Sequence, residues 1–111
     1  MAESPVVITI EAARSAPLPP GRLSPEMMRH GSLEVRFYAP RGSDPQKPHD
    51  RDEAYIVMSG TGWFRRGGER HRFKSGDFLF VPAHVEHRFE DFSDDLELWV
   101  VFYGAEGGEQ P

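Results

Sequence analysis

The chain has 111 residues, a length that fits one ordinary domain and leaves little room for a second hydrophobic core. Acidic residues outnumber basic ones by 18 to 13, which gives a formal net charge of −5, whereas nucleic-acid-binding proteins usually present a basic surface. The absence of cysteine excludes disulfides and thiolate metal sites, so any metal must be bound through nitrogen and oxygen atoms. The composition therefore predicts a single domain that binds small molecules or other proteins, and no nucleic acid.

We expect no targeting signal in the N-terminal region, residues 1–31. It lacks a basic segment followed by a long apolar run, and no apolar run in the chain approaches the length that spans a bilayer. We therefore expect a cytoplasmic protein without a membrane partner. Within this region, residues 6–11 fit a first strand and residues 15–21 a proline-rich crossing. Residues 24–31 fit one helical turn, because Ser24 is a good N-cap and proline follows it.

Residues 32–103 are dominated by short apolar runs between turn residues and show no sustained helical period. Leu33, Val35 and Phe37 alternate with polar residues, which predicts a half-buried strand with one core face and one wetter face. Residues 53–59 are apolar on both faces and predict a strand that is covered on both sides.

The remaining segments complete an all-β pattern. The Gly67-Gly68 pair supplies the positive φ angles that a two-residue hairpin turn needs. Later strands are expected within residues 77–82, 87–91 and 96–103, and residues 104–111 are expected to form a disordered tail. About eight short strands predict a single-domain barrel or two-sheet sandwich, because both leave few open edges.

Two surface features are predicted from strand alternation. Apolar residues that face outward, with Ile56 and Met58, predict a sheet-to-sheet interface of a homodimer. A basic run on the hairpin is split over two faces and predicts a solvated hairpin; it consists of Arg65, Arg66, Arg70, His71 and Arg72. His30 and His71 lie in polar, turn-like contexts, and we assign them no function.

Two histidines and a carboxylate in strand-like sequence predict a metal site. In an extended strand, residues two and four apart share a face, so His49 and Glu53 would point into one cavity. The same face would carry Lys47, His49, Arg51, Glu53, Tyr55 and Val57. A metal bound by imidazole and carboxylate needs a further ligand from another strand, and His87 is the natural candidate.

The spacing of these residues resembles the first motif of the cupin family, whose members are double-stranded β-helix or jelly-roll barrels. That motif is Gly, five residues, His-x-His, three or four residues, Glu, six residues and Gly. His49 fits the second histidine, Glu53 the glutamate and Gly60 the closing glycine. Lys47 stands in the place of the first histidine. The resemblance covers residues 32–103 and implies a cupin-like barrel there.

The family's second motif is Gly, five residues, Pro-x-Gly, two residues, His, three residues and Asn. Gly76, Pro82 and His87 fit it at the right spacings, while His84 replaces the glycine of Pro-x-Gly and Asp91 replaces the asparagine. Agreement in two separated segments predicts the jelly-roll fold.

The resemblance implies a divalent metal, such as Fe, Mn, Ni or Zn, bound by His49, Glu53 and His87. The family's three histidines and one glutamate are thus reduced to two histidines and one carboxylate, as in non-haem iron enzymes. Lys47, Arg51, Tyr55 and His84 are candidates for substrate binding, although His84 fits a position at the rim better than a fourth ligand.

The sequence allows several roles for the Lys47 ammonium group. In the metal-bound case its ammonium must turn away, lose its proton, or meet a negative substrate or Glu53. In the alternative, the pocket holds no metal and Lys47 forms a salt bridge with Glu53.

The implied function is a metal-dependent oxygenase, isomerase or lyase that acts on a small anionic molecule. The alternatives are a non-catalytic sensor or storage module that binds a small ligand, and a purely structural dimerisation domain. Fold alone does not choose among these.

Overall fold

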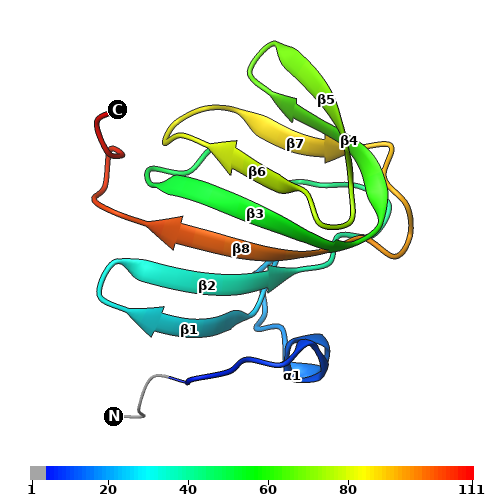
Figure 1. Cartoon of the computed structure of the whole chain (residues 1–111), viewed down its shortest axis with the longest axis vertical. Helices are drawn as coiled ribbons and strands as arrows, with labels where there is room; N and C mark the ends of the chain where they lie inside the picture. Colours follow the sequence, from blue (N-terminus) through cyan, green and yellow to red (C-terminus); the bar gives the residue numbers. More distant parts are fainter. Residues whose placement is uncertain (1–4) are drawn as a thin grey trace.

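The computed structural model describes residues 5–111 and shows eight strands in two antiparallel sheets (Figure 1). The five-stranded sheet has the order β1-β2-β8-β3-β6 and the three-stranded sheet the order β5-β4-β7. The strands are β1 (Glu26–His30), β2 (Leu33–Tyr38), β3 (Asp52–Ser59), β4 (Thr61–Arg66), β5 (Glu69–Lys74), β6 (Phe78–Val81), β7 (His87–Glu90) and β8 (Glu97–Tyr103). The predicted all-β, single-domain architecture is confirmed.

The N-terminal region differs from the prediction, and its residues 1–4 lie outside the described part of the chain. The expected strand over 6–11 is wrong, because α1 (Ile10–Ser15) begins within it. The Thr9 side chain caps this helix by accepting a hydrogen bond from the Ala12 amide. The expected helical turn over 24–31 is also wrong, since most of this segment is the edge strand β1, paired with β2.

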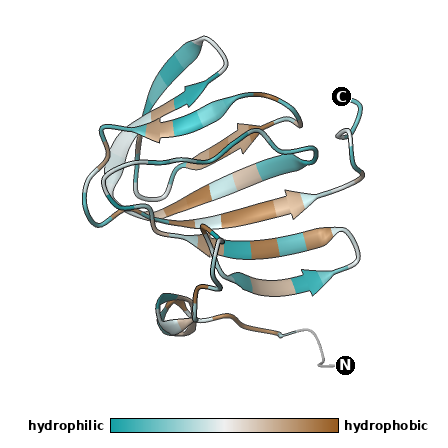
Figure 2. Ribbon diagram, turned by 180° about the vertical axis from the view of Figure 1, so that it is seen from behind, coloured by the Kyte–Doolittle hydropathy of each residue, from teal (hydrophilic) through white to brown (hydrophobic). Residues whose placement is uncertain are grey.

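Strand β2 has the alternation that the sequence predicts, but its polar face is the one that faces the barrel interior. Glu34 is 6% exposed and Tyr38 5%, and both line the main cavity together with Arg36. Figure 2 shows the alternation of hydrophilic and hydrophobic residues along this strand. The side that we expected to be wetter is therefore a polar wall inside the barrel. Hydropathy alone cannot distinguish such a wall from solvent.

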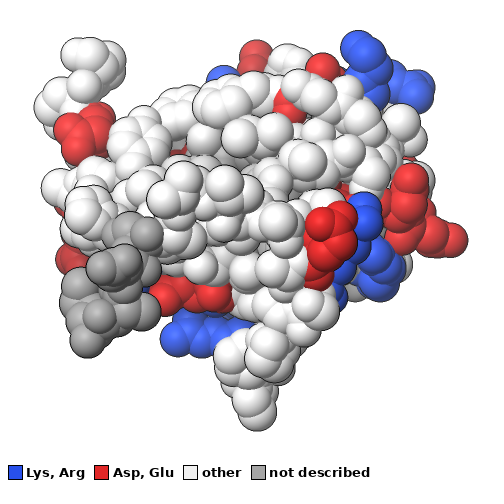
Figure 3. All heavy atoms as spheres, turned by 60° about the horizontal axis from the view of Figure 1, so that its bottom comes forward, with Lys and Arg blue, Asp and Glu red and all other residues white. Residues whose placement is uncertain are grey.

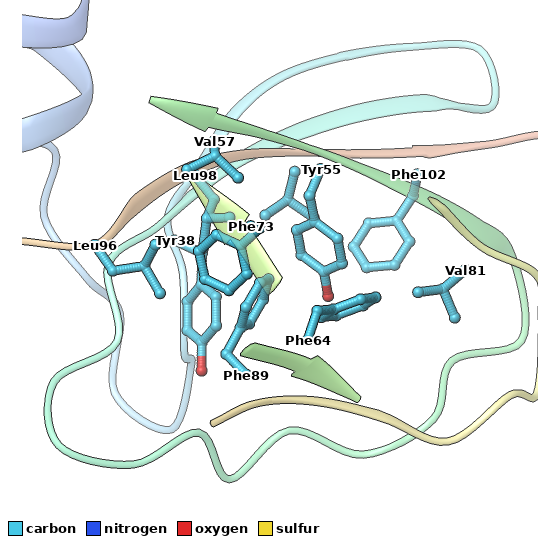
Figure 4. Close-up of a cluster of buried hydrophobic side chains, with 11 residues drawn as sticks. Tyr38, Tyr55, Val57, Phe64, Phe73, Val81, Phe89, Leu96, Leu98 and Phe102 are labelled. Atoms are coloured by element: carbon cyan, nitrogen blue, oxygen red, sulfur yellow. The ribbon is translucent and has the colours of Figure 1, made fainter. Parts of the chain in front are cut away.

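The core lies inside the barrel and includes Tyr38 from this wall. Its buried cluster consists of Tyr38, Tyr55, Val57, Phe64, Phe73, Val81, Phe89, Leu96, Leu98, Val100 and Phe102. Tyr55, Phe64 and Phe89 pack with ring centroids 4.9 to 5.7 Å apart (Figure 4), in the range that aromatic pairs prefer. Phe78 and Phe80, by contrast, lie exposed on β6.

The predicted Gly67-Gly68 hairpin is confirmed. Arg66 pairs with Glu69 across the turn, and Gly67 has a φ of 59°. On this hairpin, Arg65 and Arg70 are cross-strand partners, and both form ion pairs with Glu90 of β7. Arg65 and Arg70 are therefore each paired with a carboxylate.

Residues 104–111, expected to form a disordered tail, make backbone hydrogen bonds with the barrel. The amide of Gly107 donates to the Asp50 carbonyl at 2.6 Å, and the amide of Glu109 donates to the Asp52 carboxylate at 2.8 Å. The tail thus closes against the start of β3.

The surface view in Figure 3 shows a broad uncharged middle, with acidic and basic groups towards its margins. Within residues 5–111, no helix has both the length and the apolar character needed to cross a bilayer.

Candidate metal centre

His87 opens strand β7 and is held in one orientation by its own turn. Its Nδ1 lies 2.9 Å from the carbonyl oxygen of Val85. A carbonyl can only accept, so Nδ1 carries a proton, and whenever the ring is neutral Nε2 presents its lone pair to the interior. This arrangement, in which one ring nitrogen is fixed by a hydrogen bond, is typical of metal-binding histidines.

The lone pair of His87 meets the Glu53 carboxylate. Glu53 Oε1 lies 3.1 Å from His87 Nε2, and both side chains are at most 2% exposed. Neither atom has a hydrogen-bond partner among the described residues. Two buried acceptors that face each other without a donor are unfavourable, so a cation between them would satisfy both.

His49 completes the group from the opposite side. Its Nε2 lies 3.8 Å from Glu53 Oε1, and its ring centroid is 5.5 Å from that of His87. Possible ligand atoms of His49, Glu53 and His87 all lie within 4.8 Å of one another. The side chain of His49 is 36% exposed, so the group is buried on one side and open on the other.

The Glu53 carboxylate favours positive charge beside it, and the pKa values of the two imidazoles are shifted in opposite directions. Burial lowers the pKa of His49, against the opposite effect of the Glu53 carboxylate. Burial also acts to lower the pKa of His87, but the Glu53 carboxylate and the Val85 carbonyl outweigh it and raise that pKa. The carboxylate therefore attracts positive charge to the space between Glu53 and His87.

The segment before β3 is a loop, although the sequence predicted an extended strand from Lys47 onward. Pro45 and Pro48 interrupt any ladder there, and β3 begins only at Asp52. His49 is nevertheless fixed, because its carbonyl accepts the His84 amide at 2.6 Å and its ring packs edge-on against Phe102 at 4.9 Å.

Lys47 lies on the exposed side of this loop and is not among the residues that line the cavity. Within residues 5–111, the ion pairs of Glu53 are with His49 and His87, and none joins Glu53 to Lys47. The structure thus places Lys47 away from the cavity lining and shows no salt bridge between it and Glu53 among the described residues.

The candidate centre opens into a cavity of about 320 Å³. Its charged lining consists of Arg22, Glu34, Arg36, Asp50, Arg51 and Glu53. With both histidines neutral these charges cancel. A divalent metal ion would leave a surplus of two positive charges.

Arg51 lines the cavity, and its partner is Glu34. The two are joined at 2.6 Å, and Glu34 also binds Arg36 at 2.6 Å and Arg29 at 2.9 Å. The Arg51 guanidinium lies 5.4 Å from the ring centroid of Phe102. This cluster lines the same cavity, and Glu34 lies on the same sheet as Glu53, with Phe102 of β8 between them. Sequence analysis missed Glu34 and Arg36 because it assigned their face to solvent.

Tyr55 and His84 are placed very differently. Tyr55 is fully buried at the base of the cavity, with its hydroxyl donating to Gln46. His84 is exposed on the turn before His87 and contributes its backbone amide to His49. Its φ of 69° lies in the left-handed region, which explains why glycine suits this place in the motif.

Sequence analysis also missed a buried polar network behind the centre. Asp44 is 4% exposed and accepts hydrogen bonds from the Tyr38 hydroxyl, the Gln46 side chain and the Phe89 amide. Gln46 is 8% exposed and lines the cavity beside His49 and Glu53. The network links the loop that carries His49 to the strand that carries His87. No periodicity points to it, since it lies in an irregular loop.

Comparison with known proteins agrees with this architecture. A family model described as "Cupin domain" matches residues 35–102. An uncharacterised protein of Streptomyces coelicolor is 38% identical over 79 residues, which cover 69% of this chain and 75% of that protein. A solved cupin-2 domain protein from Shewanella frigidimarina superposes with a TM-score of 0.69 at 17% identity, covering 88% of this chain and 95% of that one.

A third relative has a stated role. The HTH-type transcriptional activator RhaS of Shigella sonnei is 32% identical over 74 residues, which cover 67% of this chain. These residues cover only 26% of the activator, so the chain spans about a quarter of its length.

Proposed function

The chain belongs to the cupin family, and we propose that it binds a divalent metal through His49, Glu53 and His87 and acts on a small anionic molecule. The observation that carries the proposal is the buried contact between Glu53 Oε1 and His87 Nε2, two atoms without a hydrogen-bond donor. The donor set of two imidazoles and one carboxylate suits Fe, Mn, Ni or Zn.

When bound, such a metal supplies either a redox centre or a Lewis acid that polarises a carbonyl or carboxylate oxygen. The chain's own residues supply the surroundings. The buried side chains of Glu53 and His87 exclude water from one side, while the more exposed His49 leaves access from the cavity. Arg51, which lines the same cavity, is placed to bind and orient an anionic group of the ligand.

The charge of the cavity supports an anionic ligand. Its arginine and carboxylate charges balance before a metal is added, so a small dicarboxylate would neutralise the surplus that a divalent ion creates. The volume of about 320 Å³ suits a molecule of that size.

The proposal is tested by metal analysis of the purified protein after loading with Fe, Mn, Ni or Zn. The wild type should retain about one equivalent, whereas His49→Ala and His87→Ala should lose it. His71→Ala is the matched control, because this histidine is exposed on β5. A wild type without stoichiometric metal under all four loadings would contradict the proposal.

A second candidate function is a non-catalytic sensor or storage module, and the similarity to a transcriptional activator favours it. The two functions differ in turnover. Metal-loaded protein would be incubated in air with a panel of small carboxylates and diols, and both oxygen uptake and product formation would be followed. Turnover supports the enzyme. Saturable binding in calorimetry without turnover supports the sensor.

The expected homodimer would form through the outer face of β3 and β6. Phe78 is 65% exposed, Met58 40%, Phe80 38% and Ile56 37%. Ile56 and Phe78 are cross-strand partners, so these side chains form one apolar patch without charges. A second copy is the fitting occupant, because two chains of net charge −5 can approach through an uncharged patch without burying a charge. The cytoplasmic location and the lack of a nucleic-acid partner remain predictions from the sequence.

A further inference from the structure

The two neighbouring residues Gln46 and Lys47 point in opposite directions. Gln46 is 8% exposed and lines the cavity together with His49 and Glu53. Lys47 is exposed and lies outside that lining. This loop therefore directs the side chain of residue 46, and not that of residue 47, towards the candidate centre.

The orientation of the Gln46 carboxamide is determined by its partners. One end lies 2.6 Å from Asp44 Oδ2, and since a carboxylate only accepts, this end must be the amide nitrogen. The other end, the oxygen Oε1, accepts the hydroxyl of Tyr55 at 3.0 Å. The nitrogen is thus anchored away from the cavity, and the oxygen is directed to the base of it.

The Gln46 oxygen has capacity for a further interaction. An amide oxygen carries two lone pairs, and among the described residues the Tyr55 hydroxyl is the one donor to it. The same Tyr55 ring lies 6.2 Å from the His87 ring, and burial and the Glu53 carboxylate both raise the pKa of its hydroxyl. The Tyr55 side chain therefore links Gln46 Oε1 to the region around Glu53 and His87.

We propose that Gln46 supplies a fourth protein ligand, an amide oxygen, to the metal held by His49, Glu53 and His87. This inference rests on the proposed metal binding. Amide oxygen is a hard, neutral donor that suits Mn, Fe and other divalent ions. It takes the role that Lys47 cannot take from the exposed side of the loop, and Asp44 fixes its orientation as a hydrogen-bonded outer partner would.

The test measures metal affinity for Zn²⁺ and Ni²⁺ by competition with a chromophoric chelator, together with the visible spectrum of bound Co²⁺. Gln46→Ala should weaken affinity by about tenfold or more and change the Co²⁺ spectrum. Gln46→Glu keeps an oxygen donor and should therefore bind metal about tenfold or more tightly than Gln46→Ala does. Gln46→His should show a Co²⁺ spectrum altered by an added nitrogen ligand.

Two variants separate ligation from structure. Lys47→His should leave affinity and spectrum unchanged, because its side chain is exposed. Tyr55→Phe removes the hydroxyl partner of Gln46 but keeps the amide oxygen, so metal binding should be retained. Urea unfolding of each metal-free variant reports any loss of stability separately from affinity.

The outcomes distinguish the two proposals. If the wild type binds no metal, the proposed metal function itself is wrong. If the wild type binds metal and Gln46→Ala matches it in affinity and Co²⁺ spectrum, metal binding stands and the role of Gln46 is overturned. If Gln46→Ala is less stable without metal but binds metal with unchanged affinity, the role of Gln46 as a ligand is likewise overturned, because the residue then acts only in the structure.

Discussion

Glu53 Oε1 and His87 Nε2 lie 3.1 Å apart in the barrel interior, and neither has a hydrogen-bond partner among the described residues. With His87 neutral the contact is costly in the metal-free protein, since a buried unsatisfied polar group costs about 1–3 kcal/mol. The same contact becomes favourable when a cation lies between the two atoms. Stability without metal and affinity for metal should therefore change in opposite directions at this position.

Glu53→Gln tests this relationship. The amide can donate a hydrogen bond to His87 Nε2, so the metal-free variant should gain about 1 kcal/mol in free energy of unfolding. Its stabilisation by added Ni²⁺ or Zn²⁺ should be largely lost, because a ligand charge is gone. Urea unfolding with and without metal measures both effects.

Glu90→Gln is the control, because Glu90 is paired with Arg65 and Arg70 on the outer hairpin. It should leave the response to metal unchanged. A metal-free Glu53→Gln protein less stable than the wild type would show that the two groups share a proton and are not two opposed acceptors.

Much of the barrel was predictable from the sequence, because strand alternation and turn residues are local signals. The hairpin at Gly67-Gly68 and the strand β2 are examples. Strand β1 was not, since its five residues carry no clear period and form a strand only by pairing with β2. Gln46 was not predictable for a related reason. Pro45 and Pro48 make the loop before β3 irregular, so counting in steps of two from Glu53 gives Lys47 as the inward residue, whereas Gln46 is the one that lines the cavity.

His84→Gly should stabilise the protein. His84 has a φ of 69°, and a non-glycine residue in the left-handed region costs of the order of 1 kcal/mol. Its side chain is exposed, and the amide that donates to the His49 carbonyl is kept in the variant. Thermal and urea unfolding should show a gain of about 0.5–1 kcal/mol after the greater freedom of the unfolded glycine is included.

Asp91→Gly is the matched comparison for His84→Gly. Asp91 also has a positive φ, 47°, but aspartate tolerates this region better than most residues, and it is paired with Arg70. Its replacement should therefore bring a smaller gain or none. A loss of stability in His84→Gly would mean that the exposed imidazole makes a stabilising contact in solution.

Gly60→Ala should be strongly destabilising. A Cβ at this position would lie 2.7 Å from the backbone Cα of Leu96, and Gly60 has a φ of 98°. Overpacking against backbone and left-handed strain together should cost about 2–4 kcal/mol. Gly68→Ala is the control, because a Cβ there meets nothing within 4 Å. Chemical denaturation should separate the two variants clearly; equal stability would show that the chain segment around Leu96 can move aside.

The buried Glu34 should make stability depend on acid pH. Burial acts to raise its pKa, but hydrogen bonds from Arg36 and Arg51 and the charge of Arg29 outweigh burial and hold the pKa below the ordinary value of 4.5. A carboxyl whose pKa is lowered by folding contributes stability that is complete above its unfolded pKa and is lost as pH falls through the folded value. The wild type should therefore lose stability below about pH 4.5.

Glu34→Gln isolates this contribution. At pH 7 the variant should be less stable, because three guanidinium groups lose their shared carboxylate. The difference from the wild type should shrink as pH falls below 4.5, the ordinary value, because protonation removes the same charge from the wild type. Urea unfolding from pH 7 to 3 measures this, and a difference that is independent of pH would contradict it.

Met58→Glu tests the homodimer. Met58 is 40% exposed on the outer face of β3, near Phe78 at 65%, so a carboxylate there would place like charges against each other across a two-fold interface. Sedimentation velocity should show a dimeric wild type and a largely monomeric variant. Thr61→Glu adds the same charge at an exposed position of the other sheet and should remain dimeric. A wild type that is monomeric at all concentrations would contradict the homodimer. Loss of the dimer in both variants would show that the interface is not specific to this apolar patch.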